Sequence, residues 1–301
     1  MRETPHASLA RSAGSGRRVL IAAVASAASF AGLYAAAPAQ AENAYQQFAR
    51  FGRCPFNNPE AADCTVARSS GGSEFAAGNM TVHLAKPLVL QGGLHPFEEG
   101  PRENELEFIA AEGAETLVRT NEVAPPLEEV VEPALLSESE TARYDEAVSK
   151  KQTKDTVTLE LAGPPATIGL NVSNLILESG TALNLPVKVR LNNRFLGPNC
   201  YVGSNASPIN IYLTTGTSGT LTGKAGTLKV RGNGEFLELK ADSLVNNTYA
   251  APAVSGCGVS GGADAALDAK IGLPSPEGKN ASIIEGTLFL ASAERVRELF
   301  G

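Results

Sequence analysis

The sequence predicts a mainly β protein, with an antiparallel β-sandwich or barrel-like body, a few short helices and an acidic insertion. Alternating apolar and polar residues form short runs, and turn signals rich in Gly, Pro and Asn separate them at intervals of roughly 8–14 residues. Hydrophobic residues make up 43% of the 301 residues and charged residues 19%, so the composition is that of a folded chain. This spacing of strands and turns does not fit alternating βαβ units, in which a helix follows each strand.

Residues 1–41 have the pattern of an export signal. Arg17 and Arg18 precede an uncharged run over 19–37, and Ala39-Gln40-Ala41 places small residues where a signal peptidase cleaves. A single membrane anchor is the alternative, but the run is near the lower length limit for spanning. The paired arginines leave both the general secretory and the twin-arginine route open. We therefore expect a secreted, extracellular protein without a membrane span after cleavage, and cell-wall association stays open.

Cys54, Cys64, Cys200 and Cys257 are the four cysteines, and all follow the predicted signal. An even number in an oxidising compartment predicts disulfides, for which three connectivities are possible. We favour Cys54–Cys64 and Cys200–Cys257, because the first pair brackets a short loop rich in Pro and Asn and the second joins two turn-rich stretches.

Residues 42–97 form the N-terminal β and loop part of the predicted body. A short helix is expected over 43–51, where Asn43 is a good N-cap and aromatic residues follow at three-residue spacing. Gly78-Asn79 is a turn dipeptide between two β-rich runs and predicts a hairpin. The expected strands cover 74–77, 80–84 and 88–90.

Residues 98–153 form the acidic insertion, which is predicted to be partly helical or flexible. Fifteen Asp and Glu stand against three Arg over 98–147. Ser137 followed by Glu140 is a capping box, so a helix is expected over about 137–150. The segment could act as a binding arm for a cation or a basic partner. A solvated loop with one amphipathic helix is the interpretation that we favour.

Residues 154–301 form the main β body, which ends in a short helix. Ser292 is the expected N-cap of that helix over 293–300. The stretch 215–226 is almost wholly Thr, Gly and Ser, and it predicts a long turn or loop. The expected strands are 156–161, 168–172, 175–177, 185–191, 208–213, 228–230, 236–239, 244–245 and 283–290.

Several segments carry a resemblance to known proteins. They are CPFNNPEAADCTVARSSGGSEFAAGNMTVHLAKPLVLQGGL (54–94), TLELAGPPATIGLNVSNLILESGTALNLPVKVRLNN (158–193), NRFLGPNCYVGSNASPINIYLTTGTSG (193–219), SLVNNTYAAPAVSGCG (243–258) and GLPSPEGKNASIIEGTL (272–288). These segments resemble a family of uncharacterised secreted actinobacterial proteins. Residues 127–153 depart from that pattern. The resemblance implies export, and it implies no activity, ligand or catalytic residue.

The sequence offers little nucleophile or metal chemistry. Residues 258–262 satisfy the nucleophile-elbow pattern G-x-S-x-G around Ser260, but that chemistry needs a downstream histidine and none follows His95. His83 lies in an alternating strand, where a surface histidine is the simpler interpretation. Zinc is disfavoured because there is no C-x-x-C and few histidines. We predict no catalytic residue, no metal site and no cofactor.

Dispersed carboxylates are the basis of an alternative function, a secreted hydrolase using Asp and Glu residues. The absence of Trp removes the usual sugar-stacking surface, and no EF-type calcium loop surrounds the two aspartates at 264 and 268. The candidate carboxylates of the β body are Glu160, Glu178, Glu235, Glu238, Asp242, Asp264, Asp268, Glu277 and Glu285.

The prediction favoured by these patterns is a secreted, non-catalytic binding or structural module of unknown ligand. A cell-envelope polymer or another secreted protein is the expected partner, and the net charge of −7 argues against nucleic acid. Loops on a rigid scaffold carry recognition, which singles out 201–205 and 214–220 as candidate binding surfaces. An assembly or surface-layer subunit is a third hypothesis.

Overall fold

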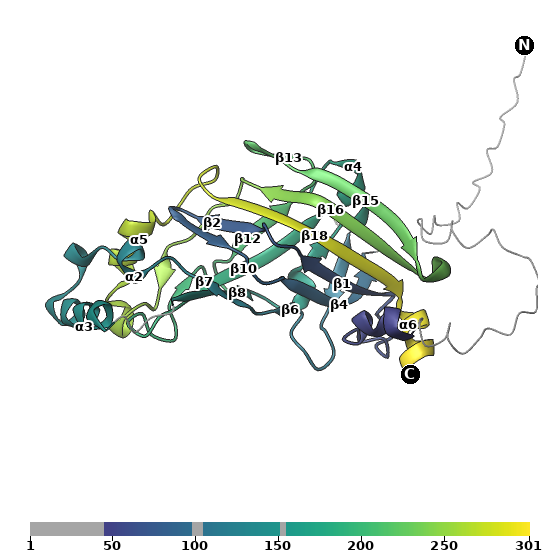
Figure 1. The fold of residues 1–301 in the computed structure, drawn as a ribbon, viewed down its shortest axis with the longest axis horizontal. Helices are drawn as coiled ribbons and strands as arrows, with labels where there is room; N and C mark the ends of the chain where they lie inside the picture. The colour runs from purple at the N-terminus through teal and green to yellow at the C-terminus, as the bar shows by residue number, and fades with distance from the viewer. Residues whose placement is uncertain (1–44, 98–104, 151–154) are drawn as a thin grey trace, which may run out of the picture. The chain divides into compact units, whose positions relative to one another are not determined.

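The computed structural model describes residues 45–97, 105–150 and 155–301, so the predicted signal segment lies outside the described residues. The described chain is mainly β and is built around one large antiparallel sheet (Figure 1). The sheet curls until two parts of it face each other across a shared core. The predicted fold class, a sandwich or barrel-like body with a few short helices, is therefore confirmed.

The first of these parts, called the first wall here, consists of five long strands in antiparallel register. Successive side chains along each strand point to opposite faces of the wall. In order across the wall they are β15 (Lys224–Arg231), β16 (Phe236–Asn246), β18 (Ala281–Ser292), β1 (Asp63–Ser69) and β4 (Val89–Pro96).

The predicted hairpin at Gly78-Asn79 extends the first wall. β2 (Glu74–Ala77) pairs with β18 and with β3 (Met80–His83). Gly78 has φ +58°, and a Cβ there would lie 2.3 Å from the carbonyl oxygen of Ile271, so only glycine fits this turn.

The second wall is centred on β10 (Leu183–Asn192). β8 (Thr156–Leu161), β9 (Gly169–Leu170), β11 (Tyr201–Val202) and β12 (Ile209–Leu213) all pair with it. The outer additions are β7 (Asn121–Val123) on β8 and β17 (Val254–Ser255) on β11.

Short pairings join the two walls on both sides of the core. On one side β5 (Leu106–Ile109) pairs with both β4 and β9, and β6 (Leu117–Val118) also pairs with β4. On the other side Thr214, directly after β12, forms an antiparallel bridge with Val245 of β16. Strand pairing therefore connects the two walls on both sides of the core, which gives the body its barrel-like character.

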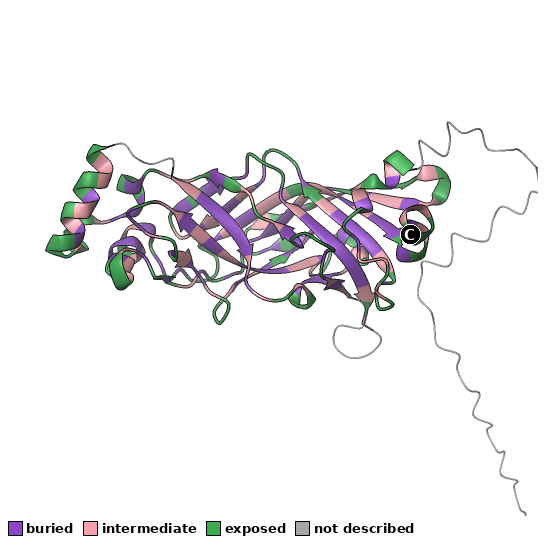
Figure 2. Ribbon diagram, turned by 90° about the horizontal axis from the view of Figure 1, so that it is seen from below, coloured by how far each residue is buried: buried purple, intermediate pink, exposed green. Residues whose placement is uncertain are grey.

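The main core fills the space between the walls, and buried residues run along the strands of both (Figure 2). A second, smaller core lies on the outer side of the first wall, where residues 45–48 are helical as predicted and continue into η2 (Ala49–Phe51). There Phe48 and Phe51 pack against Phe236 and against α6 (Ala293–Phe300). The Ser292 hydroxyl accepts a hydrogen bond from Arg295 N and caps α6, as predicted.

The acidic segment is tied to the sheet. Its described part supplies β5, β6 and β7, followed by α2 (Leu127–Val130), η3 (Pro133–Leu135) and α3 (Glu138–Ser149). The Ser137 hydroxyl accepts from Glu140 N, which confirms the predicted cap. The Glu140 carboxylate is 4% exposed and accepts from Val259 N at 2.9 Å and from Arg143 Nη1 at 2.8 Å. These bonds hold α3 against η6 (Val259–Gly261), so α3 is not a free arm.

Two predictions of local structure were wrong, and one helix was not predicted. The run 175–177 belongs to a helix, α4 (Val172–Leu177), because Asn171 Oδ1 accepts from Asn174 N and caps its first turn. The predicted loop 215–226 contains the hairpin of β13 (Thr217–Ser218) and β14 (Leu221–Thr222) and the start of β15. An unpredicted helix, α5 (Asp264–Ile271), follows the second disulfide, and two further short turns are η4 (Pro165–Thr167) and η5 (Gly232–Gly234).

Both favoured disulfides are present. Cys54 is joined to Cys64, and Cys200 to Cys257. The first closes the loop beside the second core, and the second ties β11 to the segment before α5. None of the helices in the described ranges combines the length and the apolar character that crossing a bilayer requires.

Candidate functional site

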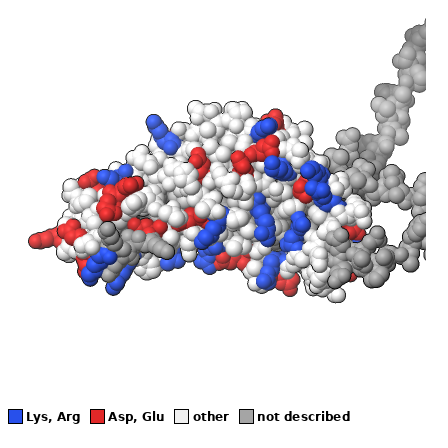
Figure 3. Space-filling model, in the orientation of Figure 1, with Lys and Arg blue, Asp and Glu red and all other residues white. Residues whose placement is uncertain are grey.

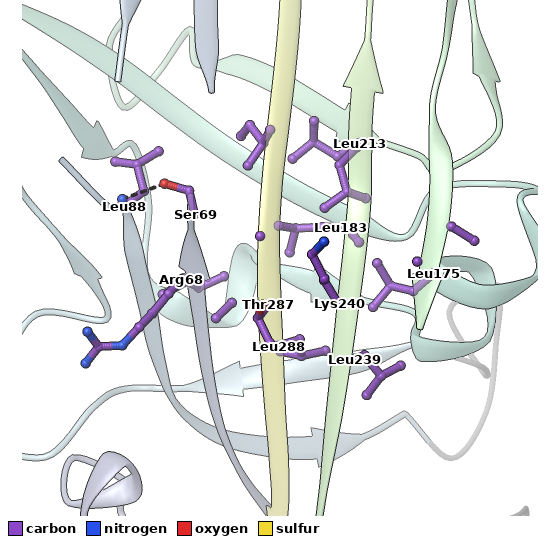
Figure 4. Close-up of a pocket in the computed structure, with 18 of the residues that line it drawn as sticks. Arg68, Ser69, Leu88, Leu175, Leu183, Leu213, Leu239, Lys240, Thr287 and Leu288 are labelled. Atoms are coloured by element: carbon purple, nitrogen blue, oxygen red, sulfur yellow. Dashed lines mark hydrogen bonds between the residues drawn. The ribbon is translucent and has the colours of Figure 1, made fainter. Parts of the chain in front are cut away.

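An apolar hollow of the described chain lies between the two walls. Its volume is about 140 Å³, close to the roughly 150 Å³ of an apolar cavity that stays dry and binds benzene. The first wall, β10, β12 and α4 all contribute to its lining (Figure 4). Eleven of the lining residues are leucines: Leu88, Leu90, Leu117, Leu175, Leu183, Leu185, Leu213, Leu228, Leu239, Leu244 and Leu288.

Strand register explains why one surface of the first wall is so apolar. Leu228, Leu239, Leu288, Ala67 and Leu90 are successive cross-strand partners from β15 to β4. Because neighbouring partners share a face of the sheet, this row turns one continuous apolar surface toward the second wall.

An adjacent row of small residues creates the empty space. Ala225, Ala241, Gly286 and Ser69 are cross-strand partners on the same face. A Cβ at Gly286 would lie 2.7 Å from the carbonyl oxygen of Arg68, so a larger residue cannot replace this glycine without a shift of the backbone. The leucines around this small-residue row therefore leave a cavity in place of a packed centre.

The polar residues that border the cavity do not place charge inside it. Arg68 and Lys240 are both cross-strand partners of Thr287, and all three lie on the opposite face of the wall from Leu239 and Leu288. In Figure 4 the guanidinium group of Arg68 points away from the leucines. Ser69 faces inward, but its hydroxyl accepts from Leu88 N at 2.8 Å. The interior therefore favours an apolar ligand, because an unpaired charge would be costly to bury there.

The cavity opens to solvent beside α4 and β15. Most of its apolar lining is buried, whereas Ile176 of α4 is 47% exposed and Leu228 of β15 is 50% exposed. Leu177 and Val230 continue this exposed surface at 67% and 49%. We call these four residues the mouth. A hydrogen bond from Ala225 N to Glu178 Oε1, 2.9 Å long, holds the end of α4 against β15.

The predicted binding loops lie near the cavity or outside it. Thr214 and Thr215 are 6% and 0% exposed, and the Thr215 hydroxyl donates to the Asn174 carbonyl of α4. The segment 214–220 therefore supports α4 and does not present an open surface over Thr214–Thr215. Tyr201 lies on the outer side of the second wall, where its hydroxyl donates to Glu160 Oε2 at 3.4 Å.

Glu160 is the most enclosed of the predicted carboxylates. Its side chain is 11% exposed and lies 3.8 Å from Arg119 Nη1 and from Lys188 Nζ. Burial, followed by the charge of Glu160, raises the pKa of Tyr201. This arrangement is that of a paired carboxylate, because two cations and a hydroxyl surround a single acid.

The other predicted carboxylates are mostly engaged in ion pairs or in hydrogen bonds to backbone amides, and the structure does not bring them together. Asp264 and Asp268 accept from Cys257 N and Val254 N, which shapes the disulfide loop before α5. The remaining partners are Ala225 N for Glu178, Arg295 for Glu235, Arg231 for Glu238, Lys240 for Asp242 and Ser70 for Glu285, while Glu277 is exposed in a turn.

The residues of the rejected motifs are also far from catalytic arrangements. Ser260 has φ +54° inside η6, a short 3-10 turn, and no strand leads directly into it. His83 lies 3.6 Å from Glu74 with an 80% exposed side chain, and His95 Nδ1 is 3.0 Å from the Glu60 carbonyl oxygen. Within the described ranges, no group of three or more Asp, Glu, His or Cys residues could hold a metal ion.

Sequence reasoning missed the cavity itself. Nine of the eleven leucines lie in predicted strands, and Leu117 and Leu183 do not. The row of small residues becomes apparent only when four strands are aligned in register. The chain matches no known family, no curated protein and no solved structure. Membership of the secreted actinobacterial family therefore stays a prediction.

Proposed function

We propose that the chain is a secreted, non-catalytic binding protein that takes the alkyl chain of a lipid-like amphiphile into the cavity between its walls. The observation that carries this proposal is an interior surface of eleven leucines, bordered by polar residues whose charges face away from it. A polar head would stay in water at the mouth.

The cavity volume sets the expected affinity. A space that accommodates benzene holds about six carbon atoms. Burial of each methylene contributes about 0.8 kcal/mol, so a filled cavity contributes roughly 5 kcal/mol before the costs of binding. Each added methylene should therefore tighten binding about fourfold until the cavity is full. Longer chains would then pass out across the mouth and gain less per carbon.

A homologous series of straight-chain carboxylic acids tests the proposal. The acids, from four to fourteen carbons, would displace a fluorescent alkyl probe from the purified protein. We expect affinity to rise steeply over about six carbons and then to level off. An affinity that is independent of chain length, or no displacement at all, would contradict the assignment.

The same samples distinguish binding from hydrolysis. An alkyl ester of the probe should be recovered intact after long incubation, because the carboxylates of the described chain are dispersed among separate partners. Release of the free acid, lost on changing a single Asp or Glu without unfolding, would favour the hydrolase hypothesis instead.

A further inference from the structure

Large exposed hydrophobic residues gather at the mouth. Nine such residues occur in the described chain, and Ile176, Leu177, Leu228 and Val230 are four of them. α4 and β15 contact each other, and Ile176 and Leu228 both line the cavity. Leu177 follows Ile176 on α4, and Val230 lies two residues after Leu228 on the same side of β15. Clustered exposed hydrophobic residues mark interaction surfaces, whereas scattered ones need no explanation. The other five are Tyr45, Val123, Leu135, Tyr212 and Val259.

β15 carries basic residues on the face opposite its exposed apolar residues. The strand carries Lys224, Lys229 and Arg231 and no carboxylate, in a chain of net charge −7. Lys229 and Arg231 alternate with Leu228 and Val230, so basic groups line the outer face and apolar groups the mouth. Among the described strands β15 pairs only with β16, so it is an edge strand, and the end of α4 contacts it at Ala225.

Basic residues continue from β15 across the outer face of the first wall. Arg68 and Lys240 lie there, and Figure 3 shows Lys and Arg side chains gathered over these strands. Carboxylates are also present: Glu238 pairs with Arg231, and Asp242 lies near Lys224 and Lys240. Lys229 has no salt bridge to any described residue, and it lies between two residues of the mouth.

We propose that the mouth docks on the surface of an anionic lipid bilayer, with its apolar residues among the acyl chains and the basic side of β15 at the headgroups. This proposal rests on the proposed function, since docking there would let an alkyl chain pass between membrane and cavity. An amphipathic element with cations beside its apolar face is the arrangement that binds anionic membrane surfaces. A second copy of this chain fits less well, because lysines on an edge strand oppose edge-to-edge pairing.

Vesicle binding by the purified protein tests the proposal. Sedimentation would compare vesicles of equal parts phosphatidylglycerol and phosphatidylcholine with vesicles of phosphatidylcholine alone. We expect at least a tenfold preference for the anionic vesicles, on the order of what two or three basic contacts supply, and a loss of binding as salt rises. Equal binding to both vesicles, or no binding, would overturn docking. Self-association without vesicle binding would assign the surface to a second copy.

Variants with matched controls locate the surface. Leu177→Glu and Val230→Glu should each lower anionic vesicle binding at least tenfold. Leu135→Glu, at a leucine of η3 that is 51% exposed, should not. Lys229→Glu should lower it as well, with exposed Lys279→Glu as its control. If the mouth variants bind like their controls, the mouth is not the docking surface.

A readout without membranes separates this proposal from the proposed function. Lys229 belongs neither to the cavity lining nor to the mouth, so Lys229→Glu should keep the affinity for the free alkyl probe. Probe binding without vesicle binding overturns docking alone. Vesicle binding without probe binding overturns the function assigned to the cavity.

Discussion

Filling the cavity from within should stabilise the protein and abolish ligand binding. Ala241 is 7% exposed, lies in the small-residue row and lines the cavity, so Ala241→Phe places a ring in a space of about 140 Å³. Empty core volume costs about 24 cal/mol per Å³, which sets an upper limit of roughly 3 kcal/mol for the gain. Water that enters through the mouth offsets part of this, so we expect the free energy of unfolding to rise by about 1–2 kcal/mol.

Urea denaturation at constant pH measures that change, and the alkyl probe measures the loss of binding. The control is Ala266→Phe in α5, where the alanine is 0% exposed and lies outside the cavity. There the same substitution should overpack the core and cost about 1–3 kcal/mol. Ala67→Phe, from the neighbouring row, offers a second way to fill the cavity. If Ala241→Phe and Ala67→Phe both destabilise the protein as much as the control does, the space between the walls is already packed and the reasoning fails.

Three further predictions concern stability. Removal of the Cys200–Cys257 disulfide by two serine substitutions should lower the free energy of unfolding by about 4 kcal/mol, because this disulfide spans 57 residues. The Cys54–Cys64 disulfide spans 10 residues and should contribute about 3 kcal/mol. Urea titrations that rank the two disulfides in the reverse order would contradict the chain-entropy account. Burial raises the pKa of Asp63 to about 6 from 3.8, so the folded chain holds that proton more tightly and stability should fall as pH rises through this interval. Asp63→Asn should remove the fall and add about 2 kcal/mol at pH 7 but nothing below pH 4, and urea titrations with parallel pH profiles for both proteins would argue against it. Glu140→Ala removes the acceptor that ties α3 to η6. Amide hydrogen exchange in α3 should therefore accelerate at least tenfold, and the free energy of unfolding should fall by about 2 kcal/mol. Unchanged hydrogen exchange would mean that other contacts hold α3 in place.

Much of the fold could be predicted because it depends on local periodicity. The strands over 156–161 and 185–191 alternate apolar and polar residues, and the structure places them as β8 and β10. Helix N-caps could also be predicted from the sequence, because Ser137 and Ser292 cap α3 and α6 as expected. The helix α4 was missed because its apolar run is short, and a single cap at Asn171 decides between helix and strand.

The site could not be predicted because it depends on register between distant segments. Ala225, Ala241, Gly286 and Ser69 are unremarkable residues in sequence, and they form a row only after β15, β16, β18 and β1 pair. The strands of the acidic segment were missed for a related reason. Its charges suggested a solvated loop, whereas short strands such as 106–109 contribute to the sheet through backbone pairing that charge does not report.

The ring of Tyr45 lies against that of Phe300, with centroids 4.7 Å apart. The described polypeptide thus starts and finishes at one spot on the second core. A short linker could therefore join these two ends, and new termini could be placed in an exposed turn. The turn at Gly278 is suitable, because no atom lies within 4 Å of a Cβ added there. Such circular permutants would allow a label or a fused reporter to be attached at a chosen turn without redesign of the interior.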